Sequence, residues 1–154
     1  LTRRFSKRTI TGSSWWAMRK DINIDVIEKY FLGQEDVICA YIFGSFAKGK
    51  ENLYSDLDIA LLLDEKVSRE KYTDIQIAVM NGLSESLNIN VDVVILNKAN
   101  TILKFQVMRD GKRVYEKRDR KNRSFEAHAL IEYFDFLPIR NILERGLIRK
   151  IKEA

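Results

Sequence analysis

Two apolar runs joined by a short polar segment constrain the fold of this chain most. The runs Val37–Phe43 and Leu57–Leu63 have the length and composition of buried strands. Gly44 and Ser45 directly follow the first run, and after ten further residues comes Asp56-Leu57-Asp58. The sequence therefore predicts two strands joined by a segment that begins with glycine and serine and ends with carboxylates.

The spacing of the carboxylates indicates a bound cation. Side chains alternate along a strand, so Asp56 and Asp58 are expected on one face, about 7 Å apart. Carboxylates on one face repel each other unless a cation lies between them, and hard divalent ions prefer oxygen ligands. Asp92 is a third acid in an apolar run, residues 90–96. Because buried carboxylates are rare unless paired or metal-bound, the three acids predict a metal site.

Gly44 and Ser45 predict a phosphate-binding turn. A strand that passes directly into a short helix presents unpaired N–H groups, which bind phosphate. Glycine lets the backbone approach a ligand closely, and the serine hydroxyl adds a donor. Phosphate binding beside carboxylate-held Mg²⁺ is what transfer of a phosphoryl or nucleotidyl group requires. Taken singly, Gly-Ser and Asp-x-Asp are also common features of turns and strand ends.

A P-loop is an alternative interpretation of the same glycine-containing segment. Residues 44–50, Gly-Ser-Phe-Ala-Lys-Gly-Lys, match the pattern G-x-x-x-x-G-K after a strand. Position 51 is glutamate instead of the serine or threonine that would hold Mg²⁺. A P-loop also continues into a long helix, whereas here a strand begins at Leu57. The P-loop interpretation is therefore rejected.

The rest of the chain alternates helices with strands. Helical spacing of apolar residues predicts one helix between Asn23, its cap, and Gly33, its end, and a second opened by Ser68. A third strand, a third helix, a short edge strand and a C-terminal helical stretch, bent or broken before Pro138, are expected at residues 91–96, 101–109, 114–115 and 119–151. This order predicts an α/β fold in which helices cover a sheet.

Composition limits the possible functions. The 154 residues suit one domain, and they contain no apolar stretch of 18 residues that would span a membrane. The single cysteine, Cys39, is expected to pack in a strand, consistent with a reducing, cytoplasmic location. The single histidine, His128, leaves no Ser-His triad or histidine-rich zinc site within one chain.

The positive net charge of +5 is concentrated at the N-terminus. Four uncompensated cations precede Met18, so residues 18–154 carry only about +1. Without an aromatic and basic stripe, this charge disfavours a nucleic-acid partner. We interpret residues 1–17 as a flexible, upstream or vector-derived extension, with a genuine basic arm as the alternative. Residues 18–117 are expected to form the catalytic domain, and residues 118–154 a helical segment packed on it.

The motifs resemble a known family. Residues 44–49, Gly-Ser-Phe-Ala-Lys-Gly, and 55–60, Ser-Asp-Leu-Asp-Ile-Ala, are similar to the signature of minimal nucleotidyltransferases, a small branch of the DNA polymerase β superfamily. Residues 91–97 resemble that family's third-acid strand. Residues 108–116 and 124–136 resemble the tail of MntA-type antitoxins, which transfer AMP to HEPN-domain ribonuclease toxins. Lys50 and Leu53 depart from a common acid and a common proline of the family.

The resemblance implies a polymerase β-like nucleotidyltransferase fold, with a mixed sheet flanked by helices and a C-terminal helical extension. It implies that Gly44 and Ser45 hold the triphosphate of ATP. Asp56 and Asp58 would bind two Mg²⁺ ions, and Asp92 would complete the metal site and take the proton of the acceptor hydroxyl. AMP would pass to a tyrosine of a HEPN-domain toxin and neutralise it.

Two alternatives remain open. An antibiotic nucleotidyltransferase of the aminoglycoside type would use the same chemistry but would need an acidic wall to bind a sugar. A non-catalytic antitoxin would neutralise its toxin by binding alone, through the C-terminal helices. The presence of an acid at all three expected positions argues against a degenerate enzyme, although steric neutralisation alongside catalysis is compatible with it.

Overall fold

A four-stranded mixed sheet forms the centre of the fold. The computed structural model describes residues 22–50, 55–117 and 121–153, so the interpretation of residues 1–17 lies outside the described part. The strand order is β3-β2-β1-β4. β1 pairs antiparallel with both β2 and β4, whereas β2 and β3 are parallel. The strands are β1 (Val37–Phe43), β2 (Leu57–Leu63), β3 (Val91–Ile95) and β4 (Lys112–Glu116).

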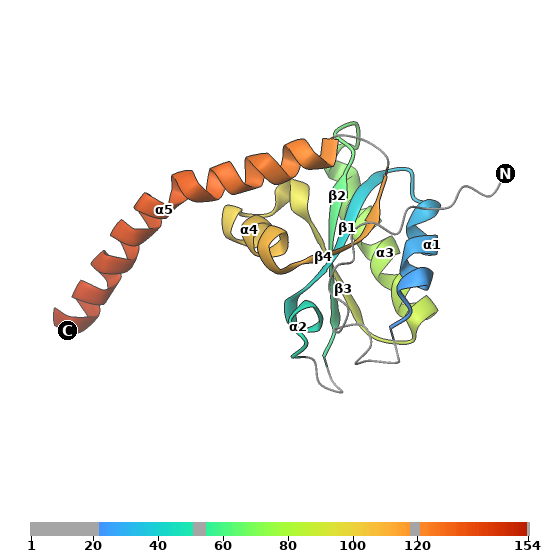
Figure 1. The fold of residues 1–154 in the computed structure, drawn as a ribbon, viewed down its shortest axis with the longest axis horizontal. Coiled ribbons are helices and arrows are strands. Elements are labelled where there is room, and N and C mark those ends of the chain that lie inside the picture. Colours follow the sequence, from blue (N-terminus) through green and yellow to red (C-terminus); the bar gives the residue numbers. More distant parts are fainter. Residues whose placement is uncertain (1–21, 51–54, 118–120, 154) are drawn as a thin grey trace.

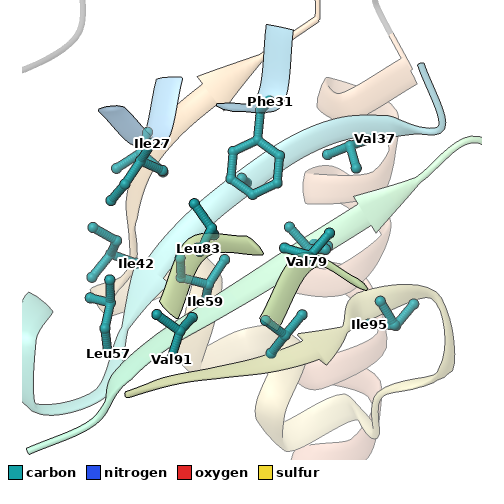
Figure 2. Close-up of a cluster of buried hydrophobic side chains, with 14 of the residues drawn as sticks. Ile27, Phe31, Val37, Ile42, Leu57, Ile59, Val79, Leu83, Val91 and Ile95 are labelled. Atoms are coloured by element: carbon teal, nitrogen blue, oxygen red, sulfur yellow. The ribbon is translucent and has the colours of Figure 1, made fainter. Parts of the chain in front are cut away.

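Helices cover both faces of this sheet. α1 and α3 lie on one face, and α4 and the first half of α5 lie on the other (Figure 1). One apolar cluster joins α1 and α3 to the sheet, with Ile27, Phe31 and Leu83 fully buried in it (Figure 2). A second cluster joins the opposite face to α4 and α5. The helices are α1 (Ile24–Leu32), α2 (Gly44–Ala47), α3 (Tyr72–Leu87), α4 (Thr101–Asp110) and α5 (Lys121–Glu153).

Several local predictions are confirmed. β1 and β2 have the expected bounds, and apart from Asp58 in β2 both are apolar because each is covered on two faces. The Asn23 side chain accepts a hydrogen bond of 3.0 Å from the Asp25 N–H and so caps α1, which ends at Gly33. β4 lies at the edge of the sheet, as the short strand near Val114 was expected to.

Two expectations need correction. The segment after Ser68 begins with a 3₁₀ turn, Arg69–Lys71, and the α-helix starts only at Tyr72. β3 ends at Ile95 because Leu96–Lys98 forms another 3₁₀ turn, in which the Asn97 side chain hydrogen-bonds both the N–H and the C=O of Leu63. These bonds hold the turn against the end of β2.

The C-terminal helix shows which of the two expected alternatives, a bend or a break before Pro138, occurs. α5 is bent and not broken, since it runs through Pro138 for 33 residues. The helix bends near its middle in Figure 1, as expected where proline removes a backbone donor and its ring crowds the preceding turn. Although α5 is long, no helix within the described ranges is apolar enough over a sufficient length to cross a membrane.

The first half of α5 is fastened to the sheet by a buried polar contact. The Tyr41 hydroxyl donates a hydrogen bond of 2.6 Å to Glu126, whose carboxylate also lies 3.2 Å from the Arg113 guanidinium. Burial is the main reason why the pKa of Tyr41 is raised far above its ordinary value. The Tyr133 ring stacks on Phe105 of α4, with 3.6 Å between ring centroids. α5 is thus fixed by contacts with both β1 and α4.

Replacing Tyr41 with phenylalanine tests how much the hydrogen bond to Glu126 contributes to stability. Tyr41→Phe should lower the free energy of unfolding by about 1.5–3 kcal/mol, because a buried hydrogen bond to a charged group is lost. Tyr115→Phe is the matched control, since the Tyr115 hydroxyl makes no hydrogen bond within the described residues and should change stability by less than ~0.5 kcal/mol. Chemical denaturation measures both changes, and equal losses would show that the Glu126 contact contributes nothing.

Candidate functional site

The pairing of the strands brings the candidate residues to one edge of the sheet. Phe43, the last residue of β1, is paired with Asp58 of β2, and Asp58 is paired with Asp92 of β3. β1 ends where β2 and β3 begin because β1 is antiparallel to β2 and β3 is parallel to it. Gly44 therefore follows β1 at the same edge where Asp58 and Asp92 lie. We call this the acid edge, defined by Gly44, Ser45, Asp56, Asp58 and Asp92.

The three carboxylates of the acid edge interact electrostatically. Burial, and then the negative charges of Asp92 and Asp56, raise the pKa of Asp58 above its ordinary value. A raised carboxyl pKa means that the ionised form is disfavoured in this environment, and a bound cation would relieve that repulsion. The acid edge thus has the electrostatic character expected of a cation site.

The acids are more accessible than predicted. Asp58 is half-buried, whereas Asp56 and Asp92 are exposed, so the expectation of three buried carboxylates is wrong. The reason is position: Asp56 precedes the first residue of β2, and Asp92 lies on β3, which is an edge strand. Exposure on this side leaves the carboxylates open to a ligand.

The side chains do not form a closed metal cage. In the part of the chain that the structure describes, no three His, Cys, Asp or Glu side chains are grouped so that they could hold a metal ion. One oxygen of Asp92 accepts a hydrogen bond of 2.9 Å from the Val93 N–H. Mg²⁺ in nucleotide sites is commonly held by one or two carboxylates together with substrate phosphates and water. The donor set of the acid edge fits Mg²⁺ bound in this shared way.

Gly44 is required by its contact with Asp58. Its φ of 69° lies in the left-handed region that residues with a Cβ rarely adopt. A Cβ built at this position would overlap the Oδ2 atom of Asp58. The turn into α2 and the carboxylate can therefore approach each other only because position 44 has no side chain. Ser45, half-buried, comes next in α2, and its hydroxyl makes no hydrogen bond within the described residues.

The sequence interpretation missed a group of charged residues beside α2. The Lys48 ammonium lies 3.7 Å from the carboxylate of Asp110, at the end of α4. Asp110 also accepts two hydrogen bonds from Arg109, at 2.7 and 2.9 Å, and these bonds with the two cations lower the pKa of Asp110. Lys48 was considered only as one position of the rejected P-loop pattern and of the family signature, and no role was given to its charge. A contact between residues 62 positions apart gives no local sequence signal.

A family model and a characterised relative both match the chain. Residues 25–120 match the family described as polymerase beta, nucleotidyltransferase. Over 75 residues the chain is 32% identical to the protein adenylyltransferase MntA of Shewanella oneidensis, which corresponds to 49% of this chain and 51% of that protein. The chain thus spans about half the length of this curated relative.

Solved structures of toxin–antitoxin complexes contain chains of the same fold. One, from a toxin–antitoxin complex with AMP-PNP, has a TM-score of 0.68 and 23% identity, over 82% of this chain and 99% of that chain. Another, from a complex of the tri-AMPylated HEPN toxin of Shewanella oneidensis with an MNT antitoxin, has a TM-score of 0.60 and 20% identity, with 82% and 99% covered. The predicted polymerase β-like fold with a mixed sheet is confirmed.

Two glycine substitutions test the contact between Gly44 and Asp58. Gly49 also has a positive φ, of 65°, but a Cβ there would meet no atom of the described residues within 4 Å. Gly49→Ala should therefore cost only the left-handed conformation, about 1–2 kcal/mol in free energy of unfolding. Gly44→Ala should cost clearly more, since the Asp58 carboxylate must also move. Chemical denaturation measures both, and equal costs would contradict the proposed close contact.

The raised pKa of Asp58 predicts how stability depends on pH. The protonated carboxyl is favoured in the folded state, so its stabilising contribution is present at low pH and is lost as pH rises through the folded-state pKa. In metal-free protein, Asp58→Asn should therefore raise the free energy of unfolding at pH 7, and the gain should shrink below about pH 4.

Asp110→Asn should show the opposite sign. The pKa of Asp110 is lowered, so this substitution should reduce stability at pH 7 and lose its effect in acid. Denaturation curves at several pH values, recorded with a chelator present, measure both variants. A loss of stability in Asp58→Asn at pH 7 would show that the three carboxylates do not repel one another.

Proposed function

Because this chain belongs to the polymerase beta nucleotidyltransferase family, we propose that it transfers AMP from ATP to a tyrosine hydroxyl of a HEPN-domain ribonuclease toxin and thereby neutralises the toxin. The observation that carries the proposal is the strand register that aligns Asp58 with Asp92 and sets both beside Gly44. This alignment supports binding of a metal–nucleotide complex at one edge of the sheet.

Each residue of the acid edge has a proposed role. Two Mg²⁺ ions, when bound, would neutralise phosphate charge and lower the pKa of the acceptor hydroxyl. Asp56 and Asp58 would hold both ions, and Asp92 would complete the site on the acceptor side. Gly44 and Ser45 would orient the triphosphate through a backbone N–H and a hydroxyl donor.

The proposed transfer is an in-line substitution at the α-phosphorus of ATP. The tyrosine oxygen forms the new P–O bond, the bond between the α-phosphorus and the bridging oxygen breaks, and pyrophosphate leaves. Asp92 accepts the hydroxyl proton, as no histidine lies on any of these strands. Lys48, whose N–H bonds the Gly44 carbonyl at 3.3 Å, would place a positive charge near the leaving pyrophosphate.

The choice of acceptor is supported by the relatives. The relative MntA is a protein adenylyltransferase, and a complex with this fold pairs an MNT antitoxin with a tri-AMPylated HEPN toxin. The exposure of Asp56 and Asp92 supports an acid edge that is accessible to a macromolecule. An aminoglycoside acceptor, in contrast, would call for an acidic wall, whereas the charged group beside α2 pairs two cations, Lys48 and Arg109, with the single acid Asp110.

Transfer of labelled AMP tests the proposal. With α-labelled ATP and Mg²⁺, label should appear on a tyrosine of a cognate HEPN-domain protein. Asp56→Asn should lower the transfer rate by at least about 100-fold, because several kcal/mol of charge stabilisation depend on the metal ligands. Asp64→Asn is the matched control: Asp64 follows β2 at its other end, so its rate should stay near that of the unmodified chain.

Mass spectrometry of the HEPN-domain protein identifies the modified residue. Undiminished transfer by Asp56→Asn would contradict the proposed mechanism. Label on RNA or on an aminoglycoside, with none on the HEPN-domain protein, would instead contradict the proposed acceptor while leaving nucleotidyl transfer intact.

A further inference from the structure

The far half of α5 has no counterpart to pack against in the described chain. From Ile139 to Glu153 every residue except Arg140 is exposed. After its bend, this half of the helix extends beyond α4 and away from the sheet (Figure 1). A helix that leaves its own domain can be stabilised only by its local sequence or by a partner.

One side of this far half is apolar. Ile139, Leu143, Leu147 and Ile151 follow at intervals of four residues and are between 55% and 75% exposed. Residues at this spacing form a ridge along one side of a helix. We call these four residues the α5 ridge. A contiguous apolar surface of this kind marks an interaction site, in contrast to a single exposed leucine.

The ridge continues the face that α5 buries in its own domain. Phe125, Ala129 and Tyr133 pack toward the sheet and α4, and 18 residues later come Leu143, Leu147 and Ile151. Eighteen residues make about five whole helical turns, so each residue of the first set lies on the same side of the helix as its counterpart in the second. The far half thus repeats the packing pattern of the first half, although no described part of this chain packs on it.

Gly146 interrupts this side of the helix with a notch. A Cβ there would meet no atom within 4 Å, so nothing in the described chain requires glycine at this position. Glycine is also disfavoured in a helix interior. In sequence it lies between Leu143 and Leu147. On the helix it lies beside the ridge, where it would let the backbone of another helix approach closely. The notch favours a helical partner over a lipid surface.

The charges on the far half indicate what kind of helix it fits. Two arginines are paired within α5, Arg140 with Glu144 at 2.8 Å and Arg149 with Glu153 at 3.0 Å. Three further cations have no ion pair within the described residues: Lys150 flanks the α5 ridge, whereas Arg145 and Lys152 lie on the opposite side of the helix. A carboxylate on a partner packed against the ridge would complement Lys150, which a second copy of this helix would meet with its own cations.

We infer that residues 139–153 of α5 dock, through the α5 ridge and Gly146, on an apolar helical surface with an acidic rim. The inference rests on the proposed function, in which the partner with this surface is the toxin that receives AMP. Docking on the far half of α5 would hold the acceptor near the acid edge and raise its effective concentration there.

Binding of a purified cognate HEPN-domain protein tests the inference. In calorimetric titrations, the single variant Leu147→Asp should bind more weakly than the unmodified chain, and the double variant Leu143→Asp, Leu147→Asp at least about tenfold more weakly. The matched control for Leu147→Asp is Ile148→Asp, which introduces the same single charge on the other side of the helix, at a residue 53% exposed, and should bind normally. Gly146→Leu, which fills the notch while favouring the helix, should also weaken binding.

Transfer kinetics separate docking from chemistry. The double variant should raise KM for the HEPN-domain protein far more than it lowers kcat, whereas Asp56→Asn should bind normally and fail to transfer AMP. If the unmodified chain binds but transfers nothing, the proposed function fails and the docking surface stands.

Three results would overturn the docking inference. The first is unchanged affinity of the double variant, with a helix content matching the control by circular dichroism. The second is self-association of the unmodified chain in sedimentation that the double variant abolishes. The third is binding to anionic phosphatidylserine vesicles through the ridge, with toxin binding unaffected.

Discussion

The close approach of Gly44 to the Asp58 carboxylate is the contact on which the candidate site depends. It exists because β1 ends directly beside the start of β2, and because a residue with φ of 69° and no side chain begins α2. The parallel pairing of β3 then adds Asp92 beside Asp58. One turn and two strand pairings thus bring the Gly44–Ser45 backbone and repelling carboxylates together, in a fold whose remaining elements cover and support that edge.

Much of this edge could be predicted from sequence because its signals are local. β1 and β2 are apolar apart from Asp58, and their bounds follow from where the apolar runs meet Gly44 and Asp56. The order of the strands could not be predicted from the pattern, since a buried strand looks the same in a parallel and in an antiparallel pair. Resemblance to a family predicted only that the sheet is mixed. The burial of the acids was overestimated because an edge strand and a residue before a strand were treated as interior positions.

Contacts between distant residues account for what the sequence did not disclose. Tyr41 and Glu126 are 85 positions apart, and Lys48 and Asp110 are 62 apart, so neither pair leaves a periodic signal. Pro138 carries a strong local signal, yet α5 continues through it with a bend. The packing of Phe125, Ala129 and Tyr133 ties the first half of α5 to the domain and leaves the apolar far half projecting from it. The acid edge and this projecting helix therefore belong to the same folded chain, joined through the first half of α5.

A structure of the chain with Mg²⁺ and a non-hydrolysable ATP analogue tests the central claim most directly. The β- and γ-phosphates should lie against the Gly44–Ser45 backbone, with Mg²⁺ about 2.0–2.1 Å from oxygens of Asp56 and Asp58. The α-phosphorus should face Asp92 and be open to solvent on the side where an acceptor hydroxyl would enter. A nucleotide bound elsewhere, or held at this edge with no metal ion between its phosphates and the carboxylates, would contradict the proposed site.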